Sequence, residues 1–166
     1  MGTRYLICIY HNGRFVVAQY GHANGQPDLI GVEVLKFLTE DNIALLRQKI
    51  HLVVPIEPED PDYDNRGIRI LDDIADAEDN VEHAFKLYFA SDGLFCSFSY
   101  VVDLDARKLE VYRGQYKGPL AEGVADGGRF AEAGVKQQTL TMAWSFDGLP
   151  KDEEQFVEAC WGSEER

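Results

Sequence analysis

Alternating apolar and polar positions predict a β-hairpin at the start of the chain. Residues 4–10 and 15–20 are rich in β-branched and aromatic side chains, and Asn12 and Gly13 lie between the two runs. Both of these residues tolerate the positive φ of a type I′ turn, which is typical of antiparallel hairpins. Glycine, proline and polar residues then fill positions 21–31, so we expect a loop that returns from the second strand.

The strand pattern returns in the second half of the chain. Apolar side chains alternate over 94–102, polar residues turn the chain over 103–108, and 109–112 forms the returning strand of a second antiparallel hairpin. Residues 140–146 predict one more strand. The intervening residues 114–138 contain six glycines and little periodicity, which predicts a long loop. Such loops are often functional or mobile.

Helical spacing marks the middle and the end of the chain. Apolar residues over 32–50 recur at helical intervals, and Thr39 or Asp41 can cap a second segment. We therefore expect either two short helices or one bent helix. A further helix is expected to open near residues 64–65, and a short acidic helix to cover 152–160.

These elements predict an α+β fold with antiparallel β-hairpins at both ends and helices from the middle of the chain. A length of 166 residues fits a single domain over 1–166. Hydrophobic residues make up 45% of the chain and aromatic residues 11%, which is enough apolar surface for a packed core.

The net charge of −13 narrows the classes of partner. An acidic protein repels phosphate backbones and anionic lipid, so we expect neither nucleic acid nor a membrane as a partner. Residues 57–80 carry ten acidic residues against two arginines, a local charge of −8. We interpret this segment as a peripheral one whose charge is used for solvation.

Cysteine, histidine and glycine spacing bears on compartment and cofactors. The three cysteines include no Cys-x-x-Cys pair, and no long apolar run or secretory signal is present, so we expect a cytoplasmic protein. The four histidines lack metal-ligand spacing, and no glycine-rich phosphate-binding motif occurs. We therefore expect no metal site and no cofactor. Asp103 and Asp105 lie two apart and could face a cation, but aspartates at a hairpin end ordinarily form the turn.

Two blocks of the chain resemble a known family. MGTRYLICIYHNGRFVVAQYG and FASDGLFCSFSYVVDLDARKLEVYRG are similar to an uncharacterised family of small fungal, bacterial and phage proteins that begin Met-Gly-Thr-Arg. In that family the strand end Val-Ala-Gln-Tyr-Gly runs into a Trp-Asp-Gly-Tyr-Pro loop. Here residues 23–27 read Ala-Asn-Gly-Gln-Pro, and Ser97 and Phe98 stand where the family has Glu and Trp. If those residues form a family site, the resemblance implies that its chemistry is altered in this chain.

The opening of the chain also resembles the N-terminal-nucleophile hydrolases, which stack two sheets between helix layers in an αββα arrangement. In the choloylglycine-hydrolase branch the start is similar to Met-Cys-Thr, and the cysteine becomes the nucleophile. The corresponding residue here is Gly2, which has no side chain. The resemblance implies either a non-catalytic ligand-binding or interaction module that keeps the scaffold, or an enzyme that acts on amide or acyl bonds of small molecules.

The catalytic candidates are Thr3, Cys96 and His22. Thr3 could be an N-terminal nucleophile only after removal of both Met1 and Gly2, because its free amine would act as the base. Otherwise it is a residue at the start of a strand. Cys96 paired with His22 could form a nucleophile and base, whereas a cysteine in a central strand is ordinarily a small apolar residue.

The ligand-binding candidates lie around the same end of the first strand, where it meets the 21–31 and 91–96 loops. They are Arg4, Tyr20, Asn24 and Asp92. Four arginines beside tyrosine rings can bind a carboxylate or stack on an aromatic ring: Arg4, Arg14, Arg66 and Arg113. The alternative use of these arginines is ion pairing with the abundant acidic residues. A small molecule or a protein is the expected partner, and the oligomeric state is left open.

Overall fold

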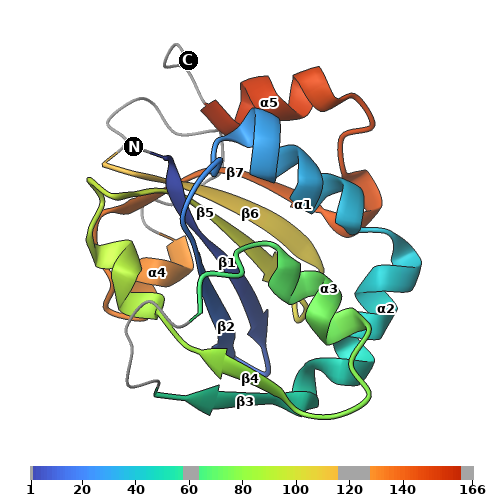
Figure 1. Cartoon of the computed structure of the whole chain (residues 1–166). Helices are drawn as coiled ribbons and strands as arrows, with labels where there is room; N and C mark the ends of the chain where they lie inside the picture. Colours follow the sequence, from blue (N-terminus) through green and yellow to red (C-terminus); the bar gives the residue numbers. More distant parts are fainter. Residues whose placement is uncertain (1, 58–63, 116–127, 162–166) are drawn as a thin grey trace.

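In a computed structural model of the protein, residues 2–57, 64–115 and 128–161 are described. Within them, five strands form a mixed sheet in the order β2-β1-β5-β6-β7 (Figure 1). The central strands β1 and β5 are parallel, and the other neighbours are antiparallel. The strands are β1 (Arg4–His11), β2 (Arg14–Gly21), β5 (Cys96–Asp103), β6 (Lys108–Gly114) and β7 (Gln138–Ser145).

Both predicted hairpins are confirmed. At the first turn, Asn12 and Gly13 have φ values of 54° and 77°, as a type I′ turn requires. The side chain of Asp105 accepts hydrogen bonds from the backbone N–H groups of both turn residues at 2.9 Å. Asp105 therefore joins the turn of the first hairpin to the turn of the second.

The predicted helices are present, and one of them begins several residues later than predicted. The helical region divides into α1 (Val32–Phe37) and α2 (Glu40–Lys49), because the Thr39 side chain caps the second helix by accepting from Asn42 N at 3.2 Å. The acidic helix is α5 (Glu153–Trp161). Helix α3 (Arg69–Ala75) begins later than residues 64–65. Arg66 still pairs with Gly21 in an isolated antiparallel bridge, so the chain is extended at that point.

Several elements were not predicted. A parallel two-strand sheet is formed by β3 (Val53–Ile56) and β4 (Val81–Ala84), and it lies beside β2 (Figure 1). Helix α4 (Gly128–Glu132) lies inside the predicted glycine-rich loop, of which 116–127 fall outside the described residues. Short helical turns are the π-helix η1 (Pro27–Gly31) and the 3₁₀-helices η2 (Ile50–Leu52), η3 (Leu87–Ser91) and η4 (Phe146–Gly148).

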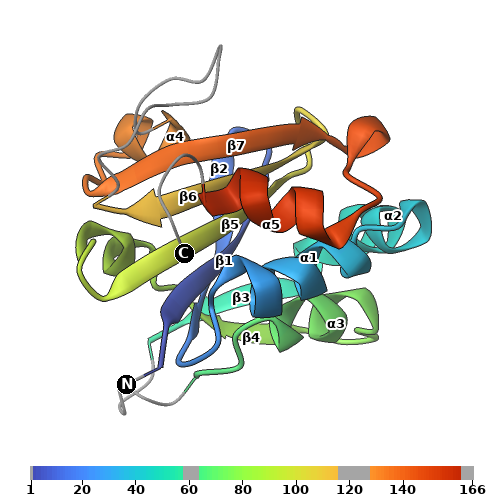
Figure 2. The same cartoon turned by 90° about the horizontal axis from the view of Figure 1, so that it is seen from above.

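Helices pack on both faces of the five-stranded sheet. Successive residues of a strand point to opposite faces, so Tyr5 and Ile7 of β1 join one core, and Leu6 and Cys8 join the other. The first core packs against helices α1, α2, α3 and α5, of which α1, α3 and α5 are seen along one side of the sheet in Figure 2. The second core packs against η3 and α4.

This arrangement differs from the αββα stacking expected from the hydrolase-like opening. In the described residues, the second face of the large sheet meets η3 and α4, and the two-strand sheet lies at the β2 edge. The physical reason is that β3 and β4 are only four residues long and cannot cover a five-stranded face. The α+β class itself is confirmed. In the same residues, no helix is long and apolar enough to cross a membrane.

Candidate functional site

A cavity of about 330 Å³ lies at the start of β1. It is formed where β1, the 21–31 loop and the turn before β5 meet, together with the ends of β6 and α5. We call it the N-terminal cavity. Its lining residues are Thr3, Gln26, Gly93, Leu94, Ser97, Phe98, Arg113, Gly114, Gln115 and Trp161.

The turn before β5 is held in place by backbone and side-chain hydrogen bonds. Cys96 N donates to Asp92 O at 2.7 Å, and the buried Gln138 side chain donates to the carbonyls of Ala90 and Cys96 at 3.0 and 3.1 Å. Gly114 allows β6 to approach this turn closely, since a Cβ there would lie 2.2 Å from Cys96 O. One wall of the cavity is therefore rigidly built.

Arg113 gives the cavity its charge. Its Nη1 donates to Trp161 O at 2.7 Å, and the guanidinium lies 5.6 Å from the Phe98 ring centre and 4.9 Å from that of Trp161. Stacking on two aromatic rings fixes the plane of the guanidinium. Among the lining residues named above, Arg113 is the only one that is charged at neutral pH. Arg113 thus brings one positive charge to the described lining of this cavity, in a protein of net charge −13.

Two buried polar atoms at this cavity have no hydrogen-bond partner within the described residues. They are Gln26 Oε1, an acceptor, and Trp161 Nε1, a donor. Buried polar groups in folded proteins nearly always have a partner, and leaving one without costs about 1–3 kcal/mol. Both residues line the N-terminal cavity, and a molecule that carries an acceptor and a donor is the chemical complement of these two atoms.

Thr3 is the one catalytic candidate that lines the cavity. Its backbone carbonyl accepts from Gly25 N at 2.9 Å, which ties the start of β1 to the 21–31 loop. Its role as a nucleophile stays a prediction, because it requires a chain that begins at Thr3.

Cys96 and His22 are not brought together. Cys96 pairs with Arg4 of β1, while Gly21, just before His22, pairs with Tyr5 on the other side of β1. Two strand spacings, roughly 10 Å, therefore separate them. Burial raises the pKa of the Cys96 thiol to about 12, despite the opposing effect of Ser99 Oγ at 3.4 Å. The Cys96 thiol is thus kept protonated, which disfavours a nucleophilic role.

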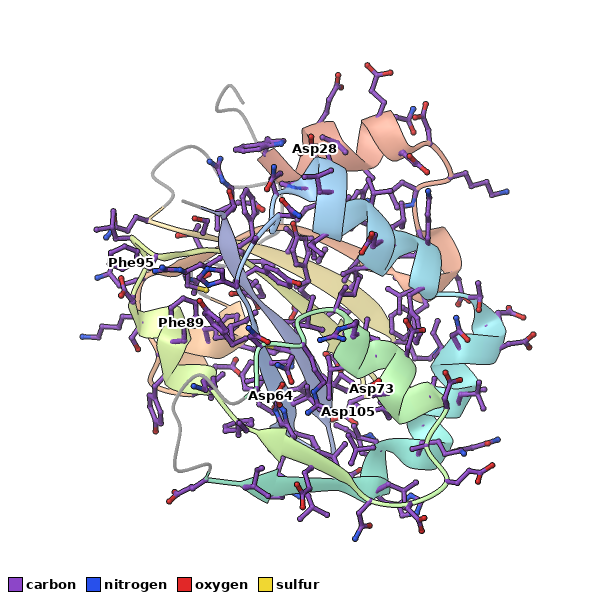
Figure 3. All side chains as sticks on the ribbon, viewed as in Figure 1. Asp28, Asp64, Asp73, Phe89, Phe95 and Asp105 are labelled. Carbon is purple, nitrogen blue, oxygen red and sulfur yellow. The ribbon has the colours of Figure 1, made fainter. Side chains whose placement is uncertain are left out.

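The four ligand-binding candidates lie outside the lining of the N-terminal cavity in the described part of the chain. Arg4 lies over the Phe95 ring at 5.2 Å, and Tyr20 packs edge-on against Phe89 at 5.1 Å. Both of these phenylalanines lie toward the left edge of the molecule in Figure 3. The Asn24 carbonyl accepts from Ile30 N at 3.1 Å, and the Asp92 side chain accepts from Phe95 N at 3.3 Å. Asn24 and Asp92 thus use polar groups to shape the loops that border the cavity.

Asp103 and Asp105, which were considered for a cation site, both make contacts within the fold. Asp105 caps the first hairpin turn, and Asp103 is bonded to Arg129. No group of three potential metal ligands occurs among the residues that the structure describes.

The acidic segment 57–80 is only partly peripheral, and its residues 58–63 fall outside the described part. Asp64 is buried, and its carboxylate accepts from Arg66 Nε and Gln19 Nε2, each at 2.9 Å. Burial alone would raise the pKa of Asp64, but the hydrogen bonds from Arg66 and Gln19 lower it to about 2. Asp64 therefore acts as a structural anion between β2 and the region before α3 (Figure 3).

Of the residues that line this cavity, Thr3 was predicted as a site residue and Arg113 was one of four arginines considered, whereas Gln26 and Trp161 were not predicted. Neither missed residue belongs to a motif, and only the fold places the end of α5 beside the 21–31 loop. Comparisons with protein-family models, with curated proteins and with solved structures found no match for this chain.

Proposed function

We propose that the protein is a non-catalytic binding protein whose small-molecule ligand occupies the N-terminal cavity. The observation that carries this proposal is a pair of buried polar atoms, Gln26 Oε1 and Trp161 Nε1, which have no partner among the described residues and belong to residues that line that cavity. Arg113 adds a positive charge in a fixed orientation. A few placed polar groups in a partly apolar hollow are typical of ligand sites.

The chemistry of the walls defines the class of ligand. The indole N–H of Trp161 and the guanidinium of Arg113 favour an anionic oxygen, for which a carboxylate is the simplest source. The Gln26 carbonyl favours an N–H or O–H donor on the same molecule. We therefore propose a small carboxylate that also carries an amide or amine N–H.

The described walls contain no side chain that could act as a base for a nucleophile. Thr3 and Ser97 contribute hydroxyl groups, and no histidine or carboxylate is among the cavity's lining residues in the described part of the chain. A hydroxyl nucleophile needs an adjacent base to be reactive at neutral pH. This composition favours binding over catalysis.

The second candidate is hydrolysis of an amide or acyl bond, and one observation favours it: the Thr3 side chain borders the same cavity. The hydrolase-like opening of the chain, and the resemblance to the Met-Gly-Thr-Arg family, belong to this proposal. Intact-mass analysis of the purified protein distinguishes the two. A chain that begins at Thr3 favours hydrolysis, and one that begins at Met1 or Gly2 leaves the amine base absent and favours binding.

The binding proposal is tested with N-acetylglycine, which carries both a carboxylate and an amide N–H. The chain has two tryptophans, so Trp144→Phe leaves Trp161 as the only indole and makes fluorescence report on the cavity. We expect N-acetylglycine to change this fluorescence at lower concentration than acetate, and methylammonium to have no effect.

Two substitutions remove the unpartnered atoms one at a time. Trp161→Phe deletes the indole N–H and keeps an aromatic ring, and Gln26→Met deletes the acceptor at similar size. Each should weaken N-acetylglycine binding by up to about tenfold in calorimetry, the usual range for one hydrogen bond. Trp144→Phe is the matched control and should bind as the unmodified protein does. Unchanged affinity in both cavity variants contradicts the proposal.

A further inference from the structure

A second cavity of about 450 Å³ lies at the opposite end of β1, beside the turn of the first hairpin. We call it the hairpin cavity. The residues that matter for its chemistry are the rings of Tyr10, Phe15 and Phe85 and the charged side chains of Arg14, Arg129 and Glu132. Among the described residues, it shares no lining residue with the N-terminal cavity.

Aromatic rings make up its apolar wall. Tyr10 meets Phe15 edge-on at 5.3 Å, and Phe15 stacks on the buried Phe130 at 5.1 Å. These contacts hold the Phe15 ring in one orientation. Phe85, by contrast, is 39% exposed although it is large and apolar. Aromatic pairs gain stability beyond the area they bury, so such a wall favours a flat aromatic ligand over an aliphatic one.

Arg129 provides a polar group of fixed direction. Its Nε donates to Glu110 Oε1 at 2.6 Å, its Nη2 donates to Asp103, and both carboxylates are buried. The guanidinium also lies 4.1 Å from the centre of the Tyr10 ring. Three contacts therefore fix its position before any ligand arrives, which lowers the entropic cost of binding.

One edge of this guanidinium makes no bond to the part of the chain that the structure describes. Within the described residues, Nη1 of Arg129 makes no hydrogen bond, whereas Nε and Nη2 are both bonded to carboxylates. Arg129 borders the cavity, and Arg14 adds an exposed second cation. Nη1 is thus placed to donate to an acceptor oxygen of a ligand, and Glu132 is the one carboxylate among the described lining residues.

We propose that the hairpin cavity binds a planar aromatic molecule that carries a carbonyl or carboxylate oxygen. The ring lies against Phe15 and Phe85, and the oxygen accepts from Nη1 of Arg129. This site is independent of the N-terminal cavity and of the function proposed for it.

Four matched probes test the proposal by ¹H–¹⁵N correlation spectra of the full chain. Benzoate and benzamide carry the ring with a carboxylate or a carbonyl, cyclohexanecarboxamide lacks the flat ring, and benzylamine lacks the acceptor. We expect benzoate and benzamide to shift the amide signals of Phe15, Leu87 and Ala133, and the other two probes to leave them unchanged.

Substitutions locate the binding. Phe85→Ala removes the exposed ring and should weaken the affinity for benzoate and for benzamide by about tenfold. Tyr88→Ala is the matched control, because this aromatic residue of the same segment is 75% exposed and does not border the cavity. Arg14→Ala distinguishes a carboxylate from a carbonyl ligand. If the charge of Arg14 contributes, this change should weaken the binding of benzoate and leave the binding of benzamide unchanged.

Three results overturn the proposal. The first is an absence of shifts in the cavity amides at saturating benzoate and benzamide. The second is equal binding of cyclohexanecarboxamide or benzylamine, which would show that neither ring nor acceptor is recognised. The third is equal weakening by Phe85→Ala and Tyr88→Ala, which would place the probes elsewhere on the surface.

Discussion

The backbone N–H of Ala18 donates a hydrogen bond to Nε2 of His83 at 3.0 Å. Because Nε2 accepts, the neutral ring carries its proton on Nδ1, which lies 4.0 Å from a carboxylate oxygen of Asp64. The Asp64–His83 pair resembles the carboxylate and imidazole of a general base. However, the nitrogen that would take a proton from a substrate is already bonded to the backbone of β2. The pair therefore has a structural role and joins β4 to the edge of the large sheet.

This pairing predicts a loss of stability in mild acid. Burial lowers the pKa of His83 from 6.5 to about 4, against the opposing effect of Asp64. The folded state thus binds a proton less readily than the unfolded state. The stability that neutral, buried His83 contributes to the folded state is fully present above pH 6.5 and is lost as the pH falls toward 4. It amounts to about 3 kcal/mol in the free energy of unfolding, measured by urea denaturation across that range.

Two variants isolate His83 from the other groups that titrate in the same range. His83→Gln keeps an acceptor without a titratable ring, so its free energy of unfolding should depend less steeply on pH. His51→Gln replaces an exposed histidine and should keep the full dependence of the unmodified protein. Equal slopes for the unmodified protein and His83→Gln between pH 6.5 and 4 would refute the assignment.

The three cysteines should be unreactive in the folded protein. Burial raises the pKa of Cys8, Cys96 and Cys160, so each thiol stays protonated and inaccessible at neutral pH. We expect labelling by iodoacetamide, followed by intact mass, to modify no cysteine in native buffer and all three in urea. Rapid labelling of Cys96 alone in native buffer would instead restore it as a nucleophile.

The elements predicted correctly are those with strong local signals. Asn12 and Gly13 define one turn, Thr39 ends one helix and caps the next, and the alternation before residue 103 defines β5. Each signal lies within a few residues of the feature it determines. The parallel contact between β1 and β5 has no such signal, because it joins strands that are far apart in the chain.

The elements and site residues that were not predicted lack such a local signal. Strands β3 and β4 are four residues each, and β3 contains Pro55, which argues against a strand in sequence alone. Their parallel pairing depends on the helix between them. At the N-terminal cavity, Thr3 was recognisable from its position near the start of the chain, whereas Arg113 was only one of four arginines of equal interest. Gln26 and Trp161 acquire their significance only from burial without a partner, which is a property of the packed structure.

The contact between Gly21 and Tyr5 predicts that Gly21→Ala is destabilising. A Cβ at residue 21 would lie 2.0 Å from the Tyr5 ring, and that ring is fixed by its hydroxyl, which accepts from Ile68 N at 3.2 Å. Forced overpacking of this kind costs about 1–3 kcal/mol in the free energy of unfolding. Combining Gly21→Ala with Tyr5→Leu should lower the free energy of unfolding by less than the sum of the two single changes, because the ring that the new Cβ would meet is then absent.

Gly148→Ala is the control for this prediction, because a Cβ at residue 148 would meet nothing within 4 Å. Urea denaturation should find it as stable as the unmodified protein. If Gly21→Ala is equally harmless, the Tyr5 ring has room to move and the close contact does not determine stability.

The buried ion pairs of Arg129 lead to a prediction about coupling. Its guanidinium bonds to Asp103 and Glu110, which together raise the pKa of Arg129 although burial opposes the charged form. Arg129→Met leaves two buried carboxylates with less compensation, since Lys108 Nζ is 3.4 Å from the far oxygen of Glu110. Removing one partner of a buried pair costs about 3–5 kcal/mol.

A double-mutant cycle separates the pair from the general effect of losing a side chain. Arg129→Met with Glu110→Leu should be markedly less destabilising than the sum of the two single variants, because neither charge is then left alone. The control cycle uses Lys36 and Glu153, whose ion pair at 3.1 Å has side chains 65% and 54% exposed. That exposed pair should show a coupling below about 1 kcal/mol. Equal coupling in the two cycles would mean that Arg129 is screened by solvent, and the fixed guanidinium required at the hairpin cavity would not exist.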